Sequence, residues 1–129
     1  MPVDRFYVIL NPVAGRGAAA RVRAVIEREL AAAGASWSLA LTERRGHAAE
    51  LAEAAAREGW PAVVAVGGDG TVHEVVNGLM RAANGGPSTP LGVVGVGSGN
   101  DFALMARIPG DPAWAVRRMV EAEPRAVDV

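Results

Sequence analysis

Apolar and polar positions along this chain follow two different periods. Short, nearly continuous apolar runs predict strands at residues 6–10, 36–41, 62–66 and 91–94, and the start of another at 125–129. Segments in which apolar residues recur every three or four positions predict helices at residues 21–33, 47–58, 71–83, 101–105 and 112–121. Strands that alternate with helices favour an α/β fold, with a mostly parallel sheet and helices on both of its faces.

Glycine-bearing turns follow three of these predicted strands, at residues 11–17, 67–71 and 95–101. Parallel strands end at the same edge of a sheet, so we expect the three turns to open together where α/β proteins bind ligands. Glycine has no Cβ and lets the main chain approach a phosphate closely. A following helix directs its N–H groups and its positive end toward such an anion. The turns therefore predict a phosphate-binding edge.

The middle turn places a carboxylate, Asp69, among the glycines of Gly67-Gly68-Asp69-Gly70-Thr71. A simple anion cradle would not hold a carboxylate beside phosphates unless a magnesium ion or a hydroxyl proton is also involved. This segment therefore predicts a site of phosphoryl transfer. The chain contains no lysine, which excludes a Walker A loop because that motif requires lysine before serine or threonine.

Composition narrows the functional classes further. A chain of 129 residues can form one domain with a sizeable core. Its formal net charge of −1 gives no sign of a nucleic-acid partner. It has no cysteine, so neither a disulfide nor a thiolate metal site can form. No apolar run approaches the length of a membrane span, and no segment resembles a signal peptide, so we expect a cytoplasmic location.

Three motifs, in this order, resemble the diacylglycerol kinase catalytic domain, a family that includes bacterial lipid kinases and is similar to the sphingosine kinases. The motifs are Asn11-Pro12-x-x-Gly15, Gly67-Gly68-Asp69-Gly70-Thr71 with Glu74 and Asn77-Gly78, and Gly97-Ser98-Gly99-Asn100-Asp101-Phe102-Ala103. The resemblance implies a phosphofructokinase-like and NAD-kinase-like α/β domain that binds ATP with magnesium. The chain departs from the family pattern at Gly95, where proline is usual, and at Ser98, where threonine is usual; serine keeps the hydroxyl.

The resemblance also implies roles for individual residues. The positions that match nucleotide contacts of the family are Asn11, Pro12, Gly15, Thr42, Gly67, Gly68, Asp69, Gly70, Thr71, His73, Glu74 and Ser98. Asp69 and Asp101 match catalytic carboxylates that hold magnesium through water near the transferred phosphate. Clustered carboxylates of this kind suit a hard cation that keeps several of its waters.

Several of these residues also have a simpler structural interpretation. Thr42 and Asp101 could each cap a following helix. Glu74 could cap the start of its own helix or reach the nucleotide ribose. His73 stands where the family more often has asparagine, and we expect it to position the main chain. His47 is expected to begin a surface helix.

Other functions compete with a lipid kinase. Residues 15–20 satisfy the dinucleotide fingerprint G-x-G-x-x-A, but residues 11–14 separate them from the strand, which disfavours a dehydrogenase. An NAD kinase shares the Gly-Gly-Asp-Gly-Thr turn but differs in the downstream motif. A non-catalytic nucleotide-binding module is a further alternative, because the sequence stops within the apolar run 126–129.

We therefore expect residues 1–129 to form the nucleotide-binding domain of a longer lipid kinase, whose β-rich lipid-binding domain is absent from this chain. The complete protein is expected to use ATP and Mg²⁺ to phosphorylate a diacylglycerol-like hydroxyl. The chain alone is expected to be inactive, because the resemblance places the acceptor site in the second domain. Expected partners are a lipid alcohol, a membrane surface contacted transiently and a possible second copy of the chain, but no nucleic acid.

Overall fold

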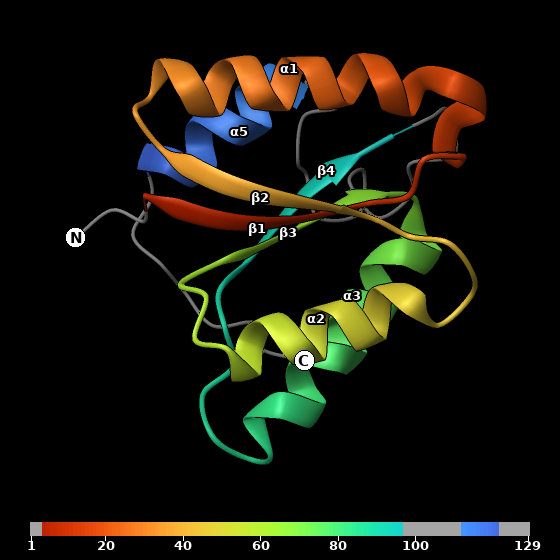
Figure 1. Ribbon diagram of the computed structural model, residues 1–129, viewed down its shortest axis with the longest axis vertical. Helices are drawn as coiled ribbons and strands as arrows, with labels where there is room; N and C mark the ends of the chain where they lie inside the picture. Colours follow the sequence, from red (N-terminus) through yellow and green to blue (C-terminus); the bar gives the residue numbers. More distant parts are fainter. Residues whose placement is uncertain (1–3, 97–111, 122–129) are drawn as a thin grey trace.

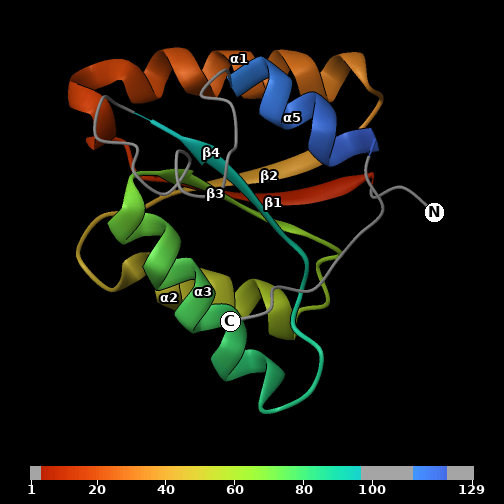
Figure 2. The ribbon, with the colours of Figure 1, turned by 180° about the vertical axis from the view of Figure 1, so that it is seen from behind.

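A parallel sheet lies between two layers of helices (Figures 1 and 2). The computed structural model describes residues 4–96 and 112–121. Within them, four parallel strands lie in the order β2-β1-β3-β4: β1 (Arg5–Leu10), β2 (Ser36–Leu41), β3 (Val63–Gly67) and β4 (Leu91–Gly95). One face is covered by α1 (Ala18–Ala32) and α5 (Pro112–Glu121), and the other by α2 (His47–Arg57) and α3 (Asp69–Ala83). The expected fold class is confirmed.

Side chains of the central strand β3 are buried on both sides of the sheet. Val64 and Val66 pack into the core beneath α1 and α5, whereas Val63 and Ala65 pack into the core beneath α2 and α3. Alternate residues of a strand point to opposite faces, so a strand covered on both sides reads as a continuous apolar run. This burial explains why residues 62–66 show no polar position.

The strand register brings the ends of the strands to one edge. Leu10 pairs with both Leu41 and Val66, and Gly67 pairs with Gly95. The segments that follow β1 and β3 therefore open on the same edge of the sheet, as expected. Of the third glycine turn, residues 97–101 lie outside the described residues, as do the predicted helix at 101–105 and the predicted strand at 125–129.

Two predicted helix starts were wrong. The helix predicted at residues 21–33 begins at Ala18, after a short 3₁₀ helix, η1 (Ala14–Gly17), where a loop was expected. Alanine is the best helix former but contributes little apolar periodicity, so the first turn of α1 has no clear signal in the sequence. The helix predicted at 71–83 begins at Asp69, which places Asp69 and Gly70 in the first turn of α3 rather than in the turn before it.

The helices α2 and α3 approach each other closely because their facing residues are small. A Cβ on Gly78 of α3 would collide with the main-chain carbonyl oxygen of Ala49 and would stand 3.0 Å from the Cβ of Ala52. Gly78 therefore serves the packing of α3 against α2.

Within residues 4–96 and 112–121, no helix combines the length and the apolar character that crossing a membrane requires.

Candidate functional site

Residues that follow β1, β2 and β3 meet at the carboxyl edge of the sheet. Main-chain hydrogen bonds join these segments: the N–H of Asn11 donates to the carbonyl of Val66 (3.0 Å), and the N–H of Thr42 donates to that of Leu10 (2.9 Å). The parallel ladder thus continues one residue beyond β1 and β2. It fixes the positions at which Asn11 and Thr42 leave the sheet.

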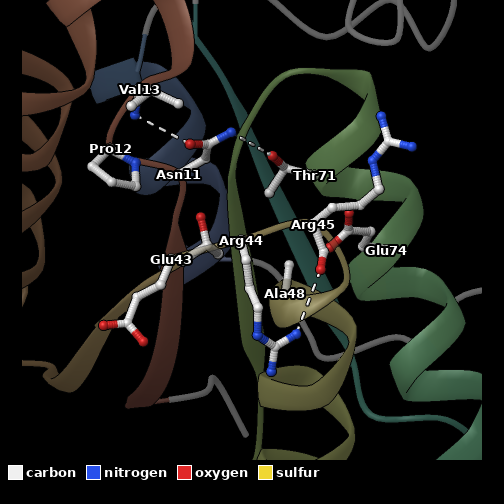
Figure 3. Close-up of a pocket in the computed structure, with 10 residues that line it drawn as sticks. Asn11, Pro12, Val13, Glu43, Arg44, Arg45, Ala48, Thr71 and Glu74 are labelled. Atoms are coloured by element: carbon white, nitrogen blue, oxygen red, sulfur yellow. Dashed lines mark hydrogen bonds between the residues drawn. The ribbon is translucent and has the colours of Figure 1, made fainter.

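The side chain of Asn11 connects the first sequence motif to the second (Figure 3). Its Oδ1 accepts a hydrogen bond from the N–H of Val13 (3.1 Å), which shapes the loop after β1. Its Nδ2 donates to Oγ1 of Thr71 in α3 (3.4 Å), across 60 positions of sequence. Asn11 is half-buried and Thr71 is buried. The side chain of Asn11 therefore fixes both the conformation of the loop after β1 and the distance of that loop from α3.

Glycine at the end of β3 allows Thr71 to take this position. A Cβ on Gly67 would stand 2.6 Å from Oγ1 and 2.8 Å from Cβ of Thr71, closer than a side chain can come. Gly68 is the N-cap residue of α3, and a Cβ there or on Gly70 would meet no atom of residues 4–96 and 112–121 within 4 Å. Among these residues, none covers the backbone at the start of α3, where the positive end of the helix dipole lies.

The predicted catalytic carboxylates are only partly covered by the described residues. Asp69 is exposed and lies in the first turn of α3, where a negative charge interacts favourably with the helix dipole. Asp101 and the predicted nucleotide contact Ser98 lie outside the described residues. Among residues 4–96 and 112–121, no group of three or more His, Cys, Asp or Glu side chains could hold a metal ion.

A pocket of about 250 Å³ opens beside Asn11 and Thr71 (Figure 3). This volume is slightly below the range of about 300–1,000 Å³ common for ligand pockets. Five of the predicted nucleotide contacts line it: Asn11, Pro12, Thr42, Thr71 and Glu74. The remaining lining residues are Val13, Glu43, Arg44, Arg45 and Ala48.

Other predicted contacts lie elsewhere. Gly67, Gly68, Asp69 and Gly70 form the end of β3 and the start of α3 rather than a wall of the pocket. His73 is exposed on α3, and Gly15 lies in η1 with a positive φ of 66°, a conformation that favours glycine.

The loop between β2 and α2, residues 42–46, forms one wall of this pocket. Composition gave no reason to place Glu43, Arg44 and Arg45 in the site, because adjacent charged residues usually lie on a solvated surface. The available signal is their position directly after a strand of a parallel sheet. Arg44 forms two hydrogen bonds to the carboxylate of Glu50, of 2.6 and 2.9 Å. This hydrogen-bonded pairing raises the pKa of Arg44 and lowers the pKa of Glu50.

Neither simple capping interpretation of Thr42 and Glu74 holds in the structure. The N-cap residue of α2 is Gly46, in the left-handed conformation with φ of 85°, not Thr42. Glu74 does not cap its own helix; its Oε1 accepts a hydrogen bond from the N–H of Gly46 (3.1 Å). Glu74 therefore ties α3 to the loop that precedes α2, a contact between residues 28 positions apart.

Comparison with known proteins gives consistent results. The chain matches the family model of the diacylglycerol kinase catalytic domain over residues 5–129. It is 43% identical to human sphingosine kinase 1 over 102 residues, which are 77% of this chain and 27% of that protein. It is 34% identical to a diacylglycerol kinase of Staphylococcus haemolyticus over 122 residues, which are 95% of this chain and 36% of that protein.

The fold is also found among solved structures. A crystal structure of a diacylglycerol kinase from Bacillus anthracis superposes with a TM-score of 0.77 at 28% identity, covering 92% of this chain and 40% of that one. The chain thus spans well under half of the length of these similar proteins.

Proposed function

Because the chain belongs to the diacylglycerol kinase catalytic domain family, we propose that it is the nucleotide-binding half of a lipid kinase. In this proposal the complete protein transfers the γ-phosphoryl group of ATP, in the presence of Mg²⁺, to the hydroxyl of a diacylglycerol-like lipid. The observation that carries the proposal is the hydrogen bond between Asn11 and Thr71. It joins two of the three family motifs at the edge of the sheet, beside the accessible start of α3.

The residues at this edge suit a nucleotide. No atom of the described part of the chain crowds Gly68 or Gly70 at the positive end of α3, and such a helix end favours phosphate oxygens. Asn11, Thr42 and Glu74 supply polar groups to a pocket of about 250 Å³ next to that helix end. In this arrangement the phosphates bind along the start of α3 and the rest of the nucleotide extends toward the pocket.

The same edge offers a carboxylate for magnesium. Mg²⁺ is usually bound by one or two carboxylates together with phosphate oxygens and several waters, so a dense cluster of acidic residues is not required. We assign Asp69 to this role, with Asp101 as its partner from outside the described residues. A bound magnesium ion neutralises charge on the phosphates during transfer. Asp69 holds its carboxylate at the start of α3, where the phosphates of the proposed nucleotide lie.

The lipid acceptor is assigned to parts of the protein beyond this chain. The similar proteins are longer, and this chain covers 27% of human sphingosine kinase 1 and 36% of the Staphylococcus haemolyticus diacylglycerol kinase. Phosphoryl transfer depends mainly on positioning donor and acceptor together. We therefore place the lipid site, its general base and the transient contact with a membrane surface in the remaining sequence. We also propose that the protein is cytoplasmic.

The test is a phosphotransfer assay of the full-length protein that contains this chain. Radiolabelled ATP is supplied with diacylglycerol, sphingosine or NAD as acceptor, with and without Mg²⁺. We expect magnesium-dependent labelling of a lipid alcohol. Labelling of NAD would overturn the proposal in favour of an NAD kinase. Binding of ATP without labelling of any acceptor would favour a non-catalytic nucleotide-binding module.

A further inference from the structure

The side chain of His47 closes the loop that forms one wall of the pocket. His47 is the first residue of α2 and is half-buried. Its Nδ1 accepts a hydrogen bond from the N–H of Glu43 (2.9 Å), and its own N–H donates to the carbonyl of Arg44 (3.2 Å). Glu43 and Arg44 both line the pocket. Two hydrogen bonds to one residue therefore fold this wall against the start of α2.

The first of these bonds requires a neutral imidazole. Nδ1 can accept a hydrogen bond only when the ring proton is on Nε2, and a protonated imidazole has no acceptor at all.

Other contacts hold the remainder of the loop. Arg44 is paired with Glu50, and the N–H of Gly46 is bonded to Glu74. Among the described residues, no other side chain accepts a hydrogen bond from the N–H of Glu43. The position of Glu43 therefore depends on His47 in a way that the positions of Arg44 and Gly46 do not.

We infer that His47 is a positioning residue for the nucleotide, which acts by holding Glu43 and the adjoining pocket wall in place. The inference rests on the proposed function, because that function assigns the pocket to the nucleotide. Removal of the Nδ1 acceptor therefore weakens nucleotide binding.

Two substitutions in the full-length protein test this role. His47→Ala removes the acceptor, whereas in His47→Asn the Oδ1 atom replaces Nδ1 at the same number of bonds from the main chain. By calorimetry with ATP and Mg²⁺ at about pH 8, we expect His47→Ala to raise the Kd about three- to tenfold, the effect of losing one ordinary hydrogen bond. We expect His47→Asn to bind nearly as wild type does.

Recovery of affinity in His47→Asn, which keeps the acceptor but not the imidazole, separates positioning through this hydrogen bond from a general loss of stability. Equal affinities of wild type and both variants, or equal losses of affinity in the two variants, would overturn the inference.

A measurement without nucleotide tests the contact itself. Exchange of the Glu43 amide proton should be faster in His47→Ala than in wild type and should be restored in His47→Asn. The ¹⁵N shifts of the imidazole should show the ring proton on Nε2. An unchanged exchange rate, or a proton on Nδ1, would overturn the inference alone. Absence of ATP binding by the wild-type protein would instead overturn the proposed function, and with it the nucleotide role of His47.

Discussion

At the scale of single residues, the edge of the sheet is organised by side chains that are small or that bind the main chain. Gly67 leaves the space that Thr71 occupies, and Asn11 bonds to both Val13 and Thr71. These contacts position backbone, while Asp69 remains exposed beside them. These neighbours hold the start of α3, the segment to which the proposed function assigns the chemistry of Asp69.

The exchange Asp69→Asn in the full-length protein tests the proposed role of this carboxylate. Asparagine keeps the size of the side chain but loses the charge that would hold magnesium near the phosphates. We expect kcat to fall on the order of 10²–10³-fold, the usual cost of removing a strong electrostatic contact to the transition state. Because Asp69 is exposed, the temperature of unfolding should change little. Steady-state kinetics and thermal unfolding provide the two measurements.

A matched control is Asp4→Asn, the same chemical change at an exposed residue that precedes β1, at the opposite end of that strand. It should leave kcat unchanged. If Asp69→Asn retained more than about a tenth of the wild-type kcat, the loss would be too small for a transition-state contact, and Asp69 would be structural.

At the scale of elements, the close approach of α2 and α3 determines one side of the pocket. Gly78 and the alanines of α2 bring the two helices together, because larger residues would meet main-chain atoms. Glu74, one turn before Gly78 on α3, thereby reaches the N–H of Gly46 at the start of α2. The packing of α2 against α3 is thus coupled to the position of the loop at residues 42–46.

The substitution Gly78→Ala measures this packing. In an isolated helix, alanine would be more stable than glycine by about 1 kcal/mol. Here the added Cβ would collide with the carbonyl oxygen of Ala49, and backbone cannot move aside as a flexible side chain can. We therefore expect a net loss of about 1–3 kcal/mol in the free energy of unfolding, measured by urea denaturation.

The control for this substitution is Gly70→Ala, also within α3, where a Cβ would meet no atom of the described residues within 4 Å. It should lose no stability, and the helix propensity of alanine should raise its free energy of unfolding by up to about 1 kcal/mol. Similar stabilities of the two variants would show that the helices can separate at little cost.

At the scale of the whole molecule, the chain contains the edge proposed to bind the nucleotide, but it spans less than half the length of the proteins to which it is similar. The family model matches nearly all of this chain, residues 5–129, whereas the chain covers a minority of the length of each similar protein. A donor site without a positioned acceptor cannot supply the proximity on which phosphoryl transfer depends.

The isolated chain of 129 residues provides the corresponding prediction. We expect it to bind ATP with Mg²⁺ more weakly than the full-length protein, because part of the cleft is missing, and to phosphorylate no lipid. Calorimetry and a radiolabel assay, each run beside the full-length protein, make the comparison. Lipid phosphorylation by the isolated chain at a rate similar to that of the full-length protein would show that the acceptor site lies within residues 1–129.

The sequence by itself determined the fold class and the location of the candidate site. Burial at each position leaves a period of two or of 3.6 residues, so strands and helices can be identified locally. The start of α2 at His47, directly after Gly46, was predicted correctly. Glycine turns after parallel strands predicted the edge that Asn11 and Gly67 occupy in the structure.

Only the tertiary structure decided which residues touch at that edge. The bonds from Asn11 to Thr71 and from Gly46 to Glu74 join residues 60 and 28 positions apart. The order β2-β1-β3-β4 and the packing of α2 on α3 determine such contacts, and the period of apolar residues carries no information about either. The tertiary structure also decided that Glu43 lines a pocket wall. A local sequence pattern records whether a residue is buried, but not which residues lie opposite it.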